Sequence, residues 1–136
     1  DRERRYQTAD AQIGRGQLAG LRVLIAEDSW LIADTLCVLL EEEGARIVGP
    51  SGTNAGAIML LSQEVSDFAL VDMSLSDAFA DRLVDDLVQR TIPFAIITGY
   101  EALPTNADER AVRVIRKPID KKVLVDLLSG YVGTSQ

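Results

Sequence analysis

Five side chains that could bind a metal ion or act in group transfer lie where short apolar runs of this sequence end. They are Glu27, Asp28, Asp72, Thr98 and Lys117. Asp72 ends the run Phe68–Val71, and a short apolar run between polar residues is typical of a strand buried on both faces, although length alone leaves a buried helix segment open. In open parallel sheets, ligands bind beyond the carboxyl ends of the strands. Asp72 is therefore expected at a reactive position.

The elements that would position these side chains alternate along the chain. Strands are predicted at Leu21–Ala26, Arg46–Gly49, Phe68–Asp72, Pro93–Thr98 and Ala111–Ile115, and helices from Ser29 or Asp28 to Gly44, at Asn54–Gln63, at Ala80–Arg90 and from Asp120 to Gly130. Five strands alternating with helices predict a parallel sheet with right-handed crossovers. The fold class is thus a doubly wound, three-layer α/β/α domain.

The length and composition predict one domain. The chain has 136 residues, of which 47% are hydrophobic, enough for one core and too few for two comfortable ones. Residues 1–20 are polar and rich in glycine, and are expected to form a linker or tail. The domain is expected to span 21–130, with a short tail over 131–136. Residues 101–110 contain a proline and little apolar surface, so this segment is a candidate for a moving part of a switch, with an ordinary loop as the alternative.

The charge and residue content exclude several classes of function. A net charge of -7 argues against direct binding to nucleic acid or to an anionic membrane. The chain contains no histidine, which excludes Ser/His/Asp sites and histidine-ligated zinc within it. The lone cysteine, Cys37, is expected to be a buried hydrophobe in a reducing compartment. Because no run of about 20 apolar residues is present, no membrane insertion is predicted and the cytoplasm is the expected location.

The three acids predict a divalent cation. If the first and third predicted strands are neighbours, as in the flavodoxin-like order, Glu27, Asp28 and Asp72 converge at one end of the sheet. Two unit charges about 4 Å apart repel by roughly 4 kcal/mol at an effective dielectric near 20. Lys117 offers one positive charge, and Mg²⁺ is the hard cation that prefers oxygen ligands and keeps waters. With the metal in place, Asp72 could attack phosphorus, while Thr98 and Lys117 stabilise the transferred group.

These motifs resemble those of bacterial response-regulator receiver domains over about 21–128. The matching pieces are VLIAED, LVDMSL, the Thr98–Gly99 strand end, and RKP at Arg116–Pro118. The resemblance implies a flavodoxin-like fold with strand order 2-1-3-4-5 and phosphorylation of Asp72. It also implies Mg²⁺ held by Asp28, Asp72 and the backbone carbonyl of Ser74, with Glu27 assisting through water. Thr98 and Lys117 would read the phosphoryl group, and the peptide bond before Pro118 would be cis.

Two departures from the usual receiver pattern concern the switch. Ser76 replaces a frequent proline four residues after the acceptor, and Val114 occupies a position that is commonly Tyr or Phe three residues before the lysine. Tyr100 instead follows closely on Thr98 in PFAIITGY, a stretch similar to the FAT GUY receiver subgroup often found with HWE-type histidine kinases. We expect Tyr100 and the segment over 101–110 to take over the switching role.

The absence of histidine places the phosphohistidine donor outside this chain segment. The expected partner is a histidine kinase or a histidine phosphotransfer protein. Trp30 and Leu31 fall beside the acidic pair and off the apolar face formed by Ile32 and Leu36, so they are a candidate docking patch, with core packing of Trp30 as the alternative. A stand-alone regulator, a phosphate shuttle and the C-terminal receiver of a hybrid kinase are the three expected arrangements, and the downstream partner is open.

Two other functions fit part of the pattern. A haloacid-dehalogenase-like phosphohydrolase also uses a strand-end aspartate, Mg²⁺ and lysine, but it normally has an acid two residues after the nucleophile, where this chain has Ser74, and a different strand order. The second is a pseudo-receiver that only binds proteins, although all five site residues are present. The favoured prediction is a phosphoacceptor that assists its own phosphorylation and dephosphorylation, not a conventional turnover enzyme.

Overall fold

The computed structural model describes residues 16–99 and 109–133. The described strands are β1 (Arg22–Ala26), β2 (Arg46–Ser51), β3 (Phe68–Asp72), β4 (Phe94–Thr98) and β5 (Arg113–Arg116), and the helices are α2 (Trp30–Glu42), α3 (Asn54–Gln63), α4 (Asp81–Gln89) and α5 (Lys121–Ser129). The strands form one parallel sheet in the order β2-β1-β3-β4-β5. Both the fold class and the strand order predicted from the sequence are confirmed.

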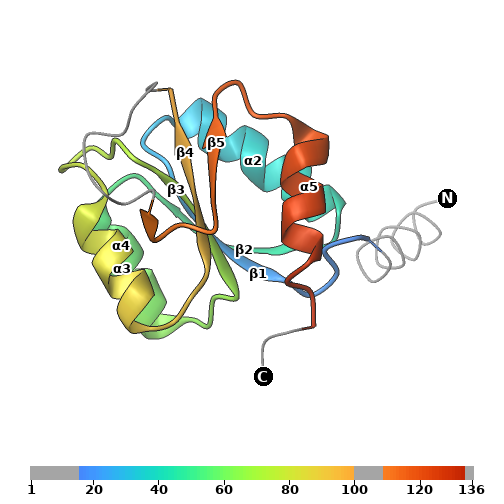
Figure 1. Cartoon of the computed structure of the whole chain (residues 1–136), viewed down its shortest axis with the longest axis horizontal. Helices are drawn as coiled ribbons and strands as arrows, with labels where there is room; N and C mark the ends of the chain where they lie inside the picture. Colours follow the sequence, from blue (N-terminus) through green and yellow to red (C-terminus); the bar gives the residue numbers. More distant parts are fainter. Residues whose placement is uncertain (1–15, 100–108, 134–136) are drawn as a thin grey trace, which may run out of the picture.

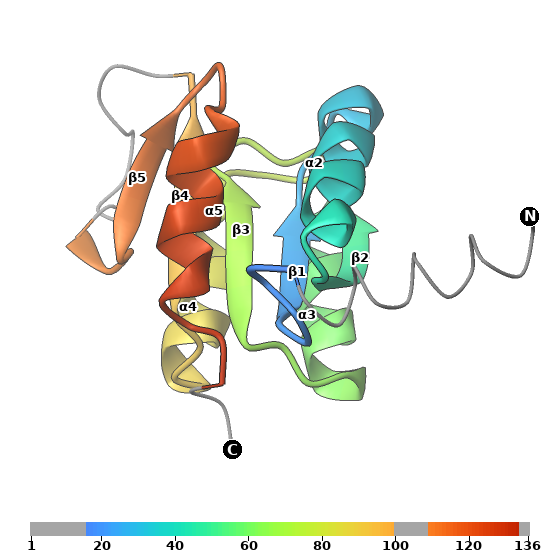
Figure 2. The same ribbon diagram turned by 90° about the vertical axis from the view of Figure 1, so that its right-hand side faces the viewer.

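The helices form two layers, one on each face of the sheet. Helices α2 and α5 cover one face, and α3 and α4 cover the other (Figure 1, Figure 2). Alternate residues of the central strands point to opposite layers, so Phe68 and Leu70 join the core under α2 and α5, while Ala69 and Val71 join the core under α3 and α4. Every residue of β3 and β4 is buried. This explains why both strands appear in the sequence as continuous apolar runs.

Helices α2, α3 and α5 each begin after a residue whose side chain accepts a hydrogen bond from a backbone N–H of the first turn. Ser29 Oγ accepts a hydrogen bond from Ile32 N at 3.4 Å, and Asp120 Oδ1 accepts one from Val123 N at 3.1 Å. Both caps are predicted by the sequence. At the other end of α2, Gly44 adopts a φ of 93°, a left-handed conformation that favours glycine. These caps fix where each helix begins or ends relative to the strand that it follows.

Some boundaries differ from the predicted ones. Strand β2 runs through Pro50 to Ser51 instead of ending in a turn at Gly49, and the peptide bond before Pro50 is cis. Pro50 is tolerated because β2 lies at the edge of the sheet, and the register with β1 shifts where the proline lacks an N–H. Strand β5 begins at Arg113, two residues later than predicted. Cys37 is half-buried at the margin of the core, so the prediction of a buried cysteine is only partly met.

The packed core extends beyond 21–130 on both sides. Leu18 lies in the segment predicted as linker, yet it is fully buried, and its N–H donates to the Glu43 carbonyl at 2.8 Å. After α5, the ring of Tyr131 lies 4.8 Å from that of Phe68, measured between centroids. Leu18 and Tyr131 both pack in the core under α2 and α5. Among the described residues, no helix has the length and apolar character needed to cross a membrane.

Candidate functional site

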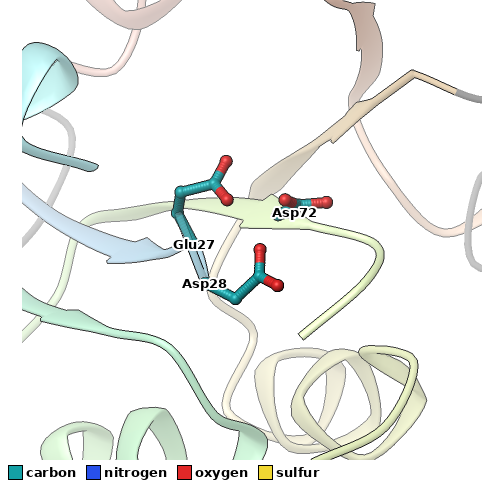
Figure 3. A group of neighbouring side chains, drawn as sticks. All are labelled: Glu27, Asp28 and Asp72. Atoms are coloured by element: carbon teal, nitrogen blue, oxygen red, sulfur yellow. The ribbon is translucent and has the colours of Figure 1, made fainter. Parts of the chain in front are cut away.

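Three carboxylates meet at the carboxyl ends of β1 and β3. Glu27 and Asp28 directly follow β1, and Asp72 is the last residue of β3, which is paired with β1 in parallel. Each of these residues offers one carboxylate oxygen, and the three atoms lie within 4.8 Å of one another. Figure 3 shows the three side chains gathered around one space. Glu27 and Asp72 are buried and Asp28 is exposed, so the cluster opens to solvent on the Asp28 side.

Lys117 brings a positive charge into this cluster. Its Nζ lies 3.0 Å from Asp72 Oδ2 and 3.4 Å from Glu27 Oε1. Lys117 directly follows β5. Its backbone N–H donates to the carbonyl of Thr98 at the end of β4, at 2.9 Å, so the two neighbouring strands fix its position. Burial alone would lower the pKa of Lys117, but the hydrogen bond and charge of Asp72, together with Glu27, raise this pKa above its ordinary value. Lys117 is therefore charged and held against the acids.

Glu27 has a raised pKa in this cluster. Burial, together with the neighbouring Asp72, raises the pKa of Glu27 to about 7, even though the N–H of Ser29 and the charge of Lys117 act in the opposite direction. Ser29 N donates to Glu27 Oε2 at 3.0 Å. The other oxygen, Oε1, is buried and has no hydrogen-bond partner within the described part of the chain, since Lys117 approaches it only as an ion pair. A buried carboxylate oxygen in this state is suited to a cation or to a metal-bound water.

Thr98 and Ser74 lie on either side of this cluster along the chain. Thr98 is buried at the end of β4, one residue after Ile97, which is aligned with Asp72 in the parallel register. Ser74 follows β3 by two residues, and its N–H donates to Asp72 Oδ1 at 3.1 Å. The structure therefore gathers Glu27, Asp28, Asp72 and Lys117 directly, and places Thr98 and Ser74 at the adjoining strand and loop.

The donor set fits a hard divalent cation. All the side-chain candidates are carboxylates, and one buried oxygen among them, Glu27 Oε1, has no hydrogen-bond partner in the described residues. Oxygen-only donors with one side open to water are the chemistry that Mg²⁺ prefers. Glu27, Asp28 and Asp72 are thus the side chains that could hold such an ion, with the Ser74 carbonyl as the backbone candidate.

An apolar groove adjoins the cluster on the α2 side. It has a volume of about 570 Å³, includes Lys117 and Thr35 in its wall, and is otherwise lined by apolar side chains: Leu31, Ile32, Leu36, Leu39, Pro118 and Ile119. The peptide bond between Lys117 and Pro118 is cis, as the receiver resemblance implies. Trp30 is 78% exposed and Leu31 is 61% exposed. The interpretation of these two residues as surface apolar groups holds, and core packing of Trp30 is wrong.

Of the two residues expected to affect switching, Val114 and Tyr100, the structure describes only Val114. Val114 is half-buried in β5 and packs against the core under α3 and α4, so an aliphatic residue fills this position as part of the core. Tyr100 lies outside the described residues, as do residues 101–108 of the segment proposed as the moving part. The switching role of Tyr100 therefore stays a prediction.

Sequence analysis misses the polar network behind the acceptor loop, the segment 73–80. Asn54 is fully buried at the start of α3 and bonds to Asp77 and to the backbone of this loop. The sequence indicates Asn54 only as the first residue of a helix. A signal was nevertheless present, because Asp77 is a short acid in a loop and Asn54 follows a threonine that caps the helix.

Comparison with known proteins gives two kinds of similarity. No protein-family model matches the chain. Among curated proteins, the sensor protein TorS of Escherichia coli is 30% identical over 122 residues, covering 85% of this chain and 13% of TorS. The transcriptional regulatory protein PdtaR of Mycobacterium tuberculosis is 28% identical over 121 residues, covering 86% of this chain and 56% of PdtaR. The chain thus spans only part of the length of these relatives.

Several solved structures are matched over nearly their whole length. A CheY-like response regulator receiver domain from Methylobacillus flagellatus has a TM-score of 0.74 at 26% identity, covering 83% of this chain and 99% of that one. The receiver domain of the response regulator PhyR from Erythrobacter litoralis also gives 0.74 at 26% identity, covering 89% and 98%. A receiver domain of the sensor histidine kinase PA1611 from Pseudomonas aeruginosa, with magnesium in its active-site cleft, gives 0.73 at 19% identity, covering 85% and 99%. With the strand order and these similarities together, the chain has the fold of CheY-like response-regulator receiver domains, and its relatives support a receiver function in two-component signalling.

Proposed function

We propose that Asp72 accepts a phosphoryl group from a phosphohistidine on a partner protein. The observation that carries this proposal is the meeting of Asp72 with Glu27, Asp28 and Lys117 at one end of the sheet. A nucleophilic carboxylate needs cationic neighbours to approach a phosphoryl group, which is itself negatively charged. Lys117 is such a neighbour, and the acid cluster is suited to a divalent cation that would supply more positive charge.

The proposed step forms one bond and breaks one bond. A carboxylate oxygen of Asp72 attacks phosphorus, and the bond between phosphorus and the donor's imidazole nitrogen breaks. The imidazole, protonated at its other ring nitrogen, leaves with the electron pair, so the products are an aspartyl phosphate and a neutral histidine. Lys117, now 3.0 Å from Asp72 Oδ2, would shift its contact to a phosphoryl oxygen, and the Thr98 hydroxyl would donate to another. Ser74 N, which donates to Asp72 Oδ1, would hold the carboxylate in orientation.

Mg²⁺ is the cofactor that we propose for this site. Asp28, Asp72 and the Ser74 carbonyl would hold it, with Glu27 assisting through water. When bound, the metal would neutralise the acid cluster and offset the negative charge of the phosphoryl oxygens. The magnesium in the cleft of the Pseudomonas receiver domain is consistent with this proposal. The buried Glu27 Oε1 supports it from within this chain.

The alternative functions fit less well. The observed strand order is the one expected for a receiver, whereas a haloacid-dehalogenase-like hydrolase would have another order. Such a hydrolase would also need an acid where this chain has Ser74. A pseudo-receiver would not require Lys117 to be held against Asp72. We therefore propose a phosphoacceptor that undergoes one modification at a time, not an enzyme that turns over many substrates.

Incubation with a small phosphodonor and Mg²⁺ tests this function. We expect intact-protein mass spectrometry to show the addition of one phosphoryl group, and peptide mapping to locate it at Asp72. Removal of Mg²⁺ by EDTA should prevent the addition, because the acid cluster and the donor would then repel each other. Continuous turnover of the donor without a modified protein would support the hydrolase, and the absence of any reaction would support the pseudo-receiver.

The donor is proposed to dock through an amphipathic helix in the groove beside α2. The groove shares Lys117 with the acid cluster, so a helix lying in it would carry a phosphohistidine directly to Asp72. Leu31 lines the groove, and Trp30 lies next to it at the start of α2. Exposed apolar side chains beside a charged pocket are suited to an apolar helix face that carries one charged group.

Substitution of Trp30 by alanine should slow transfer from the phosphohistidine donor. The loss of one buried aromatic contact costs about 1–2 kcal/mol, or roughly 5- to 30-fold in rate at low protein concentration. Labelling by a small phosphodonor should be unaffected, because it does not use the groove. Met59→Ala is the matched control, since Met59 is an exposed apolar residue of α3, on the other face of the sheet. Equal slowing of both reactions in Trp30→Ala would contradict the docking role.

The finer identity of the receiver is also a proposal. We propose that the chain belongs to the FAT GUY subgroup, on the strength of PFAIITGY and of its similarity to PhyR receiver domains. In this subgroup Tyr100 would act in place of an aromatic at Val114, which here is part of the core. The partner would be a histidine kinase or a phosphotransfer protein, and the lone cysteine favours the cytoplasm.

A further inference from the structure

Asn54 is a fully buried amide at the first position of α3, and its side chain and backbone N–H are hydrogen-bonded. Its Nδ2 donates to Asp77 Oδ1 and to the Phe79 carbonyl, each at 3.1 Å, and more weakly to the Ala78 carbonyl at 3.4 Å. Its Oδ1 accepts from Leu83 N at 3.0 Å. The side chain thus joins the start of α3 to the acceptor loop and to the first turn of α4.

Asp77 completes the connection from the loop side. Its Oδ1 accepts from Asn54 N at 2.9 Å, and its Oδ2 accepts from Ala55 N at 3.3 Å. The hydrogen bonds from Asn54 lower the pKa of Asp77, although its slight burial acts in the opposite direction. Asp77 belongs to the acceptor loop but caps the start of α3. Because its side chain is short and the hydrogen bonds are directional, it holds the loop and the helix in a fixed relative position.

The network extends from Asn54 to Asp72 in three contacts. Asn54 holds the carbonyl of Phe79, and Phe79 pairs with Ser74 in an isolated antiparallel bridge. Ser74 N in turn donates to Asp72 Oδ1. The loop is closed further by Ala80 N, which donates to the Met73 carbonyl at 2.9 Å. Ser74, the backbone candidate for the metal, is therefore held from behind by Asn54.

The loop before α3 contacts both sides of the same site. Ser76 N donates to the Gly52 carbonyl at 2.9 Å. A Cβ at Gly52 would lie 3.5 Å from Asp28 Cα, 3.7 Å from the Glu27 carbonyl oxygen and 3.8 Å from Ser76 Oγ. The backbone at Gly52 thus packs between the acidic pair and the acceptor loop. Any movement of the start of α3 would be transmitted to both.

We propose that Asn54, together with Asp77, is a positioning residue that holds Ser74 and the acceptor loop in the geometry needed for metal binding at Asp72. This inference rests on the proposed function of the site. Asn54 is not one of the proposed metal ligands and is not placed against the transferred group. It acts on the site through Phe79 and Ser74. Polar partners behind metal ligands commonly change metal affinity by 10- to 100-fold when they are removed.

The test compares Asn54→Ala and Asp77→Ala with Asp67→Ala. Asp67 accepts three hydrogen bonds from Arg22, at 2.8–3.1 Å, and both residues lie at the amino ends of their strands, opposite the site. We expect all three variants to unfold at lower temperature, because each leaves hydrogen-bonding groups without partners. Only Asn54→Ala and Asp77→Ala should weaken Mg²⁺ binding, measured by calorimetry, by roughly 10-fold or more for Asn54→Ala.

A second measurement needs no metal. Without Mg²⁺, amide hydrogen exchange of peptides covering 73–80 should be faster in Asn54→Ala than in Asp67→Ala of similar stability. The double variant Asn54→Ala/Asp77→Ala should lose less Mg²⁺ affinity than the two single losses combined, because both residues act through one loop. Asp77 is exposed, so its variant tests the idea even where Asn54→Ala fails to fold.

The outcomes separate this inference from the proposed function. If wild-type protein binds no Mg²⁺ and gains no phosphoryl group, the proposed function fails. If the wild type does both, while folded Asn54→Ala and Asp77→Ala bind Mg²⁺ as tightly as Asp67→Ala, only the positioning role is overturned.

Discussion

Replacement of Asp72 by asparagine is expected to abolish phosphorylation by both a small phosphodonor and a phosphohistidine partner. The amide keeps the size of the side chain and can still occupy the end of β3, but its oxygen is a poor nucleophile. Removal of the attacking group from a site of this kind costs on the order of 10⁴-fold or more in rate. Intact-protein mass spectrometry at matched donor and Mg²⁺ concentrations is the measurement.

The control for Asp72→Asn is a check that the variant is still folded. Lys117 keeps Glu27 as an ionic partner at 3.4 Å, and one carboxylate fewer reduces the repulsion in the cluster, so the variant should remain folded. Its circular dichroism spectrum and unfolding temperature should show this. Continued addition of one phosphoryl group to the folded variant would mean that another side chain is the acceptor, with Asp28 and Glu27 as the neighbouring candidates.

The fold could be predicted because its strands are simple in physical terms. Strands β3 and β4 are buried on both faces, so each appears in the sequence as an uninterrupted apolar run, and the polar residue that follows the run is the last residue of the strand. The edge strands are less clear. Strand β2 contains Pro50, and β5 has exposed Arg113 and Arg116 on either side of a more buried centre, so their predicted limits are off by one or two residues.

The acid cluster could be predicted for a related reason. Carboxyl ends of neighbouring parallel strands meet at one edge, so two strand-end positions and the strand order bring Glu27, Asp28 and Asp72 together. What local pattern cannot reveal is a long-range polar contact. The hydrogen bonds from the Asn54 side chain to Phe79 and to Leu83 join residues 25 and 29 positions apart in the sequence. Phe79 and Leu83 take part only through their backbone groups, so their residue types give no signal. The burial of Leu18 is missed likewise, because it stands alone in a polar segment.

Lys117→Ala should separate metal binding from phosphoryl transfer. Lys117 lies against Asp72 and Glu27, so its removal takes one competing positive charge out of the acid cluster. Mg²⁺ binding should therefore be at least as tight as in the wild type, as measured by calorimetry. Phosphorylation should be slower by about 10²- to 10³-fold, because a donor that stabilises charge on the transferred group is lost.

Lys122→Ala is the matched control for this variant. Lys122 is exposed on α5, so its substitution removes the same unit of charge away from the acid cluster and should leave both measurements unchanged. A parallel loss of Mg²⁺ affinity and of rate in Lys117→Ala would mean that the lysine chiefly holds Asp72 and Glu27 in place. Tighter or equal Mg²⁺ binding together with slow transfer would instead assign Lys117 to the reacting phosphoryl group, because an ion pair that only ordered the carboxylates could not be removed without disturbing the metal.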